Sequence, residues 1–88
     1  MKEVVQLFFP DAKCRSSFTV QSGTLWVVEA DGRRIGKGWR AASAWNNAHG
    51  RIRATFKTPS EFVWAMGDLQ EGKRQPEDYA EQLKGIDL

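Results

Sequence analysis

The sequence holds few of the side chains that carry out covalent or metal chemistry. It contains one cysteine, Cys14, and one histidine, His49. A zinc site needs about four Cys, His or carboxylate ligands at recognisable spacing, and these two residues do not form such a set. They could still form a nucleophile and its base, because such partners meet in space rather than in sequence. An idle thiol and a surface histidine are the interpretation we favour. We therefore predict no catalysis, no metal and no cofactor.

Two other segments invite comparison with catalytic or phosphate-binding sites. Residues 32–38 read GRRIGKG, but this segment lacks the GKS/T ending of a phosphate-binding loop and follows a turn instead of opening a helix. Glu61, Asp68 and Glu71 could act as paired carboxylates, but acidic residues on an exposed helix face are nearly always solvated. Neither segment predicts enzyme activity.

Charge is distributed unevenly along the chain, although the net charge is only +2. Residues 31–57 carry seven basic side chains and one acidic side chain, whereas residues 58–88 carry three basic and seven acidic ones. Residues 1–30 are balanced, with three of each. Basic clustering is the electrostatic pattern of a protein that binds a polyanion such as DNA or RNA. A solvated surface is the alternative interpretation of the same charges.

Many of these basic residues lie in a predicted β-hairpin over residues 24–40. Asp31 and Gly32 supply the two positive-φ positions of a type I′ turn. A two-residue loop would place Val28 opposite Ile35, and side chains that alternate across the sheet would form two faces. One face would carry Trp26, Val28, Arg33, Ile35, Lys37 and Trp39, and the other would carry Leu25, Val27, Glu29, Arg34, Gly36 and Gly38.

Three further segments are predicted as strands. Lys2–Phe9 is β-branched and aromatic, and it reads as a central strand buried on both faces. Residues 16–21 alternate between apolar and polar side chains before a two-residue turn at Ser22-Gly23. Residues 50–56 alternate strictly and read as a half-buried strand. With the hairpin, these segments predict a four- or five-stranded antiparallel sheet that contains two consecutive hairpins.

Helix signals follow the hairpin. Residues 40–50 are rich in alanine at helical spacing and predict two helical turns. Thr58 as N-cap, Pro59 at the first helical position and Glu61 form the clearest helix start in the chain, and this helix should extend to about residue 70. A shorter helix should begin at residues 75–78.

The expected fold is a single small α+β domain of residues 1–88, with the capped helix on one face of the sheet and the short C-terminal helix beside it. Gly36 and Gly38 mark the covered face, because interior glycine usually indicates close approach by another element. The opposite face, which bears tryptophans, would then be open, as in sheets that stack bases on aromatic rings. The alternative is a second core layer on that face, covered by residues 41–48 with Trp45, or by Phe8 and Phe9.

The segments WVVEADGRRI and RATFKTPSEFVWA resemble in pattern the three-stranded sheet and helix of AP2-type and integrase arm-binding domains. Those domains run directly from the hairpin into the third strand, whereas Gly36 to Arg51 intervene here, so the chain is not assigned to either family. The resemblance implies DNA contact by a sheet, with Arg33, Lys37, Arg51 and Arg53 at the groove or the phosphates.

The leading hypothesis is a small, non-catalytic, cytoplasmic nucleic-acid-binding protein that uses a basic and aromatic sheet face. The alternative is a protein-binding module, namely an inhibitor, immunity-type or adaptor protein of the kind that mobile elements often encode, or a homodimer, anchored by Trp45, Trp64 and Arg40. No signal peptide is visible, and the apolar runs are too short to span a membrane. The candidate residues for binding DNA, RNA or a protein partner are Trp26, Arg33, Arg34, Lys37, Trp39, Arg40, Trp45, Arg51 and Arg53.

Overall fold

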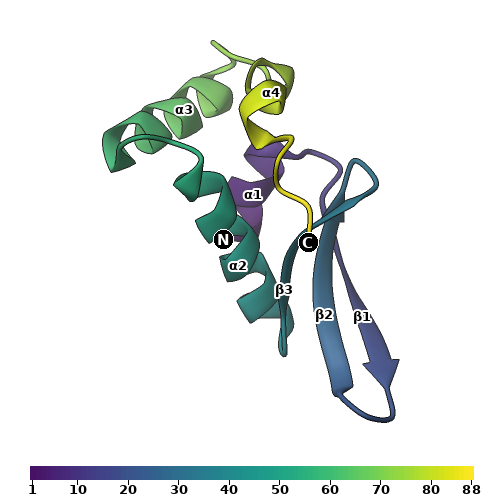
Figure 1. The fold of residues 1–88 in the computed structure, drawn as a ribbon. Coiled ribbons are helices and arrows are strands. Elements are labelled where there is room, and N and C mark those ends of the chain that lie inside the picture. The colour runs from purple at the N-terminus through teal and green to yellow at the C-terminus, as the bar shows by residue number, and fades with distance from the viewer.

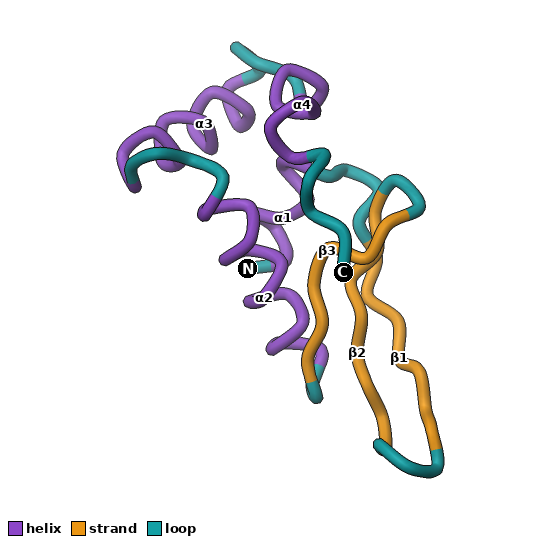
Figure 2. Tube along the Cα trace, viewed as in Figure 1, coloured by secondary structure: helices purple, strands orange, loops and turns teal.

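The computed structural model describes all 88 residues. Three strands form one antiparallel sheet in the order β1-β2-β3. Helix α2 packs along one side of the sheet, and α1, α3 and α4 gather at one end of it (Figures 1 and 2). The molecule is elongated, 45 × 22 × 21 Å, because the β1–β2 hairpin extends beyond α2 (Figure 1). None of the helices is long and apolar enough to cross a membrane. In chain order the elements are α1 (Lys2–Phe8), β1 (Lys13–Thr19), β2 (Gly23–Ala30), β3 (Arg33–Gly38), α2 (Ala41–Ala54), α3 (Pro59–Glu71), the 3₁₀-helix η1 (Pro76–Tyr79) and α4 (Ala80–Leu83).

The turn between β2 and β3 has the conformation that its sequence predicts. Asp31 and Gly32 have φ values of 53° and 70°, so both lie in the left-handed region that a type I′ turn needs. Next to the turn the expected register holds, since Ala30 pairs with Arg33.

Farther from the turn the register differs from the expected one by one residue. A β-bulge lies beside Val28, and Ile35 is the extra residue on β3. Val28 therefore pairs with Gly36, and Trp26 pairs with Gly38. A slip of one residue moves side chains to the other face of a sheet. The two glycines consequently lie on the side that bears Trp26, which corrects the predicted assignment of the faces.

Gly36 and Gly38 form the contact between the sheet and α2. A Cβ atom at Gly36 would lie 2.6 Å from the backbone oxygen of Ala44 and 2.7 Å from the Cβ of Ala48. A Cβ at Gly38 would lie 2.7 Å from the Cβ of Ser43. Cβ atoms essentially never approach other atoms this closely, so only glycine permits the contact. The helix that covers the glycines is α2, and not the capped helix α3 as expected.

Strand β1 begins and ends earlier than the predicted strand over residues 16–21. Thr19 pairs with Gly23, which leaves a three-residue loop in place of the predicted two-residue turn. Gly23 has a φ of 77°, a left-handed conformation that favours glycine in such loops. Phe18 consequently pairs with Thr24.

The first segment is the helix α1, and the predicted strand over residues 2–9 is wrong. Val5 and Phe8 are buried one turn apart, and Val4 and Leu7 pack beside them. Apolar residues at these four positions fit a helix with one buried face as well as a strand with two. Short apolar runs do not separate the two possibilities.

The predicted strand over residues 50–56 is also wrong, because α2 continues to Ala54. Gly50 lies inside this helix, and Ile52 is buried one turn after Ala48. The sheet therefore has three strands, not four or five, and the α+β class is confirmed.

The capped helix, α3, agrees with its prediction. The hydroxyl of Thr58 accepts a hydrogen bond from the backbone N–H of Glu61 at 3.2 Å, and Pro59 is the first helical residue. Gly72, with a φ of 76°, ends the helix. The predicted C-terminal helix is present as η1 and α4.

An aromatic cluster joins the helices at the end of the sheet. The ring of Phe8 stacks on that of Phe62, with centroids 5.8 Å apart. It also meets the rings of Phe56 and Tyr79 edge to face at 5.9 and 5.6 Å. Pairs of this kind stabilise by about 0.5–1.5 kcal/mol beyond their buried area. The cluster holds α1, α3 and η1 to one another.

The contact at Gly36 predicts a strong effect of one methyl group. Gly36→Ala should lower the free energy of unfolding by about 1–3 kcal/mol, because the new Cβ overlaps α2 in a packed interface. Urea unfolding followed by circular dichroism would measure the loss.

The matched control for this substitution is Gly50→Ala. A Cβ at Gly50 would meet nothing within 4 Å, so the better helix propensity of alanine should raise the stability by about 0.5–1 kcal/mol. A Gly36→Ala variant as stable as the wild type would show that β3 and α2 do not approach so closely.

Candidate nucleic-acid interface

The face of the sheet opposite α2 carries most of the basic side chains of β1 and β3. Paired residues project from the same face of a sheet, and adjacent residues along a strand project from opposite faces. Val28 is fully buried in the main core, so its neighbours on β2 project from the other side. We call this side the open face. It carries Lys13, Arg15, Ser17, Leu25, Val27, Glu29, Arg34 and Lys37.

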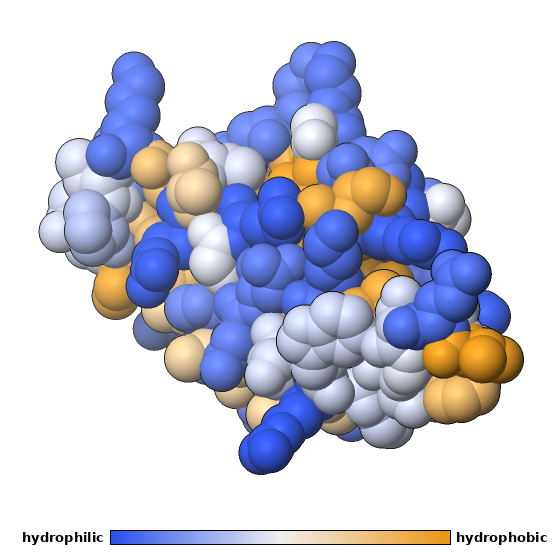
Figure 3. Space-filling model, turned by 60° about the horizontal axis from the view of Figure 1, so that its bottom comes forward, coloured by the Kyte–Doolittle hydropathy of each residue, from blue (hydrophilic) through white to orange (hydrophobic).

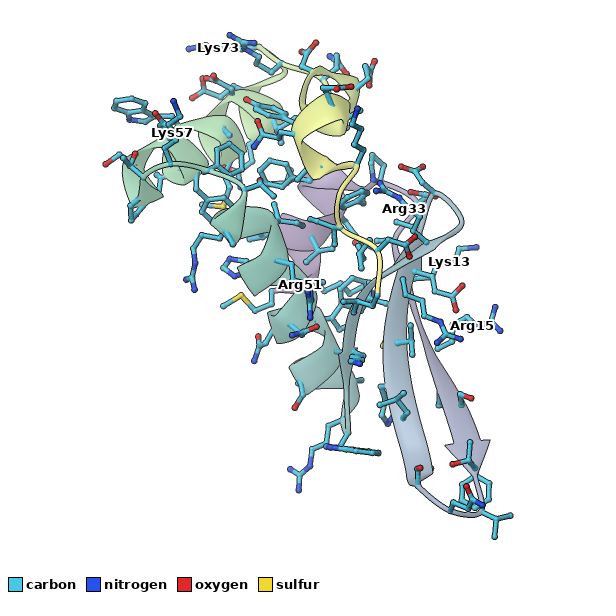
Figure 4. The ribbon with its side chains drawn as sticks, viewed as in Figure 1. Lys13, Arg15, Arg33, Arg51, Lys57 and Lys73 are labelled. Carbon is cyan, nitrogen blue, oxygen red and sulfur yellow. The ribbon has the colours of Figure 1, made fainter.

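Two rows of side chains run across the open face from strand to strand. One row is Arg15, Val27 and Lys37, and the other is Lys13, Glu29 and Arg34. Adjacent strands are about 4.8 Å apart, so the Cα atoms at the two ends of a row lie about 10 Å apart, and neighbouring rows lie about 7 Å apart. Each row thus carries a cation at both ends. Figure 4 shows the Lys13 and Arg15 side chains pointing away from α2.

Val27 at the centre of the first row shows how two of these cations are positioned. Its side chain is only 5% exposed, although it lies outside the main hydrophobic core. Arg15 and Lys37 flank it on the adjacent strands. Long basic side chains lay their aliphatic stems over apolar surface and keep their charged ends in water. Val27 therefore offers an apolar surface to the stems of two cationic side chains, and it does not neutralise their charges.

Glu29 is the only acidic residue on the open face. Its Oε1 lies 3.3 Å from the Nε of Arg15, and both side chains are more than a third exposed, so the pair contributes little to stability. Lys13, Arg34 and Lys37 form no ion pair. The open face consequently keeps an excess of positive charge.

Arg51 of α2 extends this surface beyond β3. The side-chain oxygen of Asn47 accepts hydrogen bonds from the backbone N–H of Lys37 and from the Nε of Arg51, both at 3.1 Å. The backbone N–H of Leu88 donates to the carbonyl oxygen of Arg34 at 3.0 Å. These bonds satisfy polar groups along the outer edge of β3, where an unpaired strand edge would otherwise attract another strand.

The structure brings only some of the predicted binding residues together. Arg34, Lys37 and Arg51 lie on or beside the open face. Trp39 and Arg40 are exposed just beyond the end of β3, at the end of the sheet where the polypeptide enters α2. Arg53 lies on the exposed side of α2, away from the sheet.

Two predicted tryptophans lie on the opposite side of the sheet. Trp45 is buried in the core, and Trp26 is half-buried against it. Both positions follow from the bulge and from α2, which together place the tryptophan-bearing face in the interior. The second core layer that the sequence left open is therefore the observed arrangement.

Arg33 binds the C-terminal segment of its own chain. Its Nη1 donates hydrogen bonds to the carbonyl oxygens of Leu83, Lys84 and Ile86, at 3.1, 2.7 and 3.2 Å. Its guanidinium carbon also lies 5.7 Å from the centre of the Phe9 ring. Figure 4 shows this side chain near the β2–β3 turn, beside the segment that follows α4. Arg33 thus fastens that segment to the sheet.

Sequence reasoning missed Lys13 and Arg15, because it placed both residues in a loop. The signal that could have found them is alternation. Polar side chains occupy every second position from Lys13 to Thr19, which is typical of a strand with one face in water.

Cys14 and His49 lie against different elements, and no hydrogen bond joins them. The His49 ring meets Phe62 of α3 edge to face, with centroids 5.3 Å apart, whereas Cys14 lines a shallow depression with Trp45 and Lys2. Burial raises the pKa of the Cys14 thiol, which disfavours the thiolate that a nucleophile needs. No group of three or more Cys, His, Asp or Glu side chains is placed to hold a metal ion.

Comparison with family models, with curated proteins and with solved structures finds no match for this chain. The function must therefore be argued from the site itself.

The two adjacent arginines at the start of β3 should respond differently to the same substitution. Arg33→Met should lower the free energy of unfolding by about 1.5–3 kcal/mol, because three carbonyl oxygens lose a charged donor. Arg34→Met, on the open face, should stay within about 0.5 kcal/mol of the wild type. Equal stability of the two variants in urea unfolding would contradict the assignment of Arg33 to the C-terminal segment.

The packing of His49 predicts a pH dependence of stability. Burial, and then the nearby charge of Arg53, lower the pKa of the imidazole, so the unfolded chain, with a pKa of about 6.5, takes up the proton first as the pH falls. The contribution of neutral His49 to the free energy of unfolding is therefore complete above about pH 6.5 and is lost as the pH falls below that value. His49→Gln should flatten the fall in unfolding midpoint between about pH 7.5 and 5. Parallel curves for both proteins would refute this.

Proposed function

We propose that this protein binds nucleic acid, without catalysing a reaction, through the open face of its sheet. The observation that carries the proposal is the pair of cross-strand rows with a cation at each end, three of the four cations being free of any ion pair. Phosphates are the ligands that such a surface fits, because neutralising them releases counterions from the nucleic acid.

The charge of the surrounding chain favours the same ligand. Residues 13–57, which form the sheet and α2, carry nine basic and two acidic side chains. Both acidic residues, Glu29 and Asp31, lie at or next to the β2–β3 turn. The opposite end of the sheet is free of acidic side chains. A positive potential over one half of an elongated molecule would orient it toward a polyanion.

The dimensions of the sheet allow contact with a groove. The backbones of β1 and β3 lie about 10 Å apart, and the major groove of DNA is about 12 Å wide and admits a β-ribbon. On a duplex, Arg34 and Lys37 on one side and Lys13 and Arg15 on the other would contact phosphates of opposite strands. A cytoplasmic location, where DNA and RNA are accessible, forms part of this proposal.

A second function is favoured by one observation on α3. Val63 and Trp64 are adjacent and both mostly exposed, and tryptophan is over-represented in the centres of protein interfaces. This pair would anchor a protein partner or a second copy of the chain. Light scattering of the purified protein would show from its mass whether it forms a dimer.

The salt dependence of binding tests the main proposal. Replacing Lys13 and Lys37 by glutamine removes two cations without breaking an ion pair. The slope of log K against log salt concentration should become shallower by about 2, one unit for each lost phosphate contact. Fluorescence anisotropy with labelled DNA and RNA, between about 50 and 200 mM salt, would measure it.

The matched control removes the same charge from the other half of the molecule. Lys73 and Lys84 are exposed and lie after α3 and after α4. They pair with Glu71 and Glu81, but such exposed ion pairs contribute little to stability, so replacing both lysines by glutamine should leave the slope unchanged. Equal effects of the two double variants, or no binding at the lowest salt concentration, would refute binding through the open face.

A further inference from the structure

The large exposed apolar side chains form two groups, apart from Met1 at the chain start. Phe18, Val20 and Trp39 are 70, 93 and 65% exposed. The second group is Val63 and Trp64 of α3, which are 56 and 69% exposed. Apolar side chains that gather on a surface mark sites of contact with a partner. The first group lies on the same half of the molecule as the open face.

Phe18, Val20 and Trp39 share one end of the sheet. Phe18 pairs with Thr24 close to the β1–β2 loop, which contains Val20, and Trp39 directly follows the last residue of β3. We call these three residues the aromatic end. In Figure 3 orange side chains lie at the right-hand edge of the molecule, over the β1–β2 loop, with pale side chains beside them. The β1–β2 loop extends beyond α2 (Figure 1), and all three side chains are mostly exposed.

The aromatic end adjoins the open face through Trp39, whereas Phe18 projects from the opposite side of the sheet, the side that bears Cys14, Ser16 and Trp26. Trp39 lies two residues beyond Lys37, the spacing at which strand residues share a face. A polymer with a phosphate on Lys37 would therefore have the indole of Trp39 within reach of a neighbouring base.

Charge decides which partner fits this end. Residues 12–28 and 32–60 contain no aspartate or glutamate, so the aromatic end has only neutral and basic neighbours. Two copies that met through it would bring like charges together. The exposed Trp64 is in a different situation, since it borders a hollow in which the carboxylates of Glu61 and Asp68 outnumber the one cation, Arg74. A polyanion that carries flat apolar groups is complementary to the first surface and not to the second.

We propose that the aromatic end stacks on unpaired bases, so that the protein prefers single-stranded nucleic acid to duplex. The proposal rests on the function proposed above and specifies its ligand. Indole and phenyl rings stack on the faces of bases that are not already stacked in a helix, and the phosphates of the same strand bind the neighbouring cations. Stacking of this kind tolerates any base sequence. Single strands of DNA and of RNA both offer such bases and phosphates.

The test compares two tryptophans of similar exposure. Trp39→Ala should weaken binding of a labelled single strand of about 16 nucleotides by about 5- to 100-fold, the effect of losing one stacked base. It should leave binding of the matching duplex unchanged, as well as the salt slope, because no charge is removed. Trp64→Ala is the control and should change none of these quantities.

The other possible outcomes separate base stacking, the role of the aromatic end and nucleic-acid binding itself. If the wild type binds single strand and duplex equally and Trp39→Ala has no effect, base stacking is wrong while binding through the cations remains. If Trp64→Ala weakens binding as much as Trp39→Ala, the aromatic end has no special role. If Trp39→Ala lowers the mass measured by light scattering, the end is a contact between copies. If neither nucleic acid binds at low salt, the proposed function fails, and base stacking with it.

Discussion

The close contact of β3 with α2 decides which surfaces of this protein are available. Gly36 and Gly38 bring the strand so near to the helix that no side chain fits between them and the backbone of Ala44. Because α2 lies against the glycines, the residues that share their face become the core, and Trp26 is half-buried there. The other face has no helix over it. Every cation on that face remains accessible as a consequence of two residues that have no side chain.

The position of the glycines in the sheet depends in turn on one β-bulge. The Asp31-Gly32 turn could be predicted, because its conformation follows from the residues themselves. The bulge could not be predicted, since nothing in the sequence near Ile35 marks an extra residue. It becomes favourable only when α2 packs on the side of the sheet to which the bulge brings Gly36 and Gly38. Beyond it every pairing shifts by one residue. The assignment of the faces, and with it half of the candidate site, therefore depended on a tertiary contact.

The same distinction explains the other successes and errors of sequence reasoning. The start of α3 at Thr58 and its end at Gly72 are local hydrogen-bonding features, and both were predictable. The segments 2–9 and 50–56 were assigned to strands because short apolar patterns fit either structure. Their neighbours make them helical: α1 buries Phe8 in the aromatic cluster, and residues 50–54 continue α2. With β1 placed too late, Lys13 and Arg15 could not be recognised as partners of Arg34 and Lys37.

The resulting molecule has two electrically different halves, a basic sheet with α2 and an acidic helical end, and we propose that a nucleic acid contacts only the first. A titration of isotopically labelled protein with a single-stranded oligonucleotide, followed by the backbone amide resonances in NMR spectra, would test this. Shifts should appear along β1 and β3 and at Trp39, with α3 and α4 unaffected. Shifts confined to α3 and α4, or none at low salt, would contradict it.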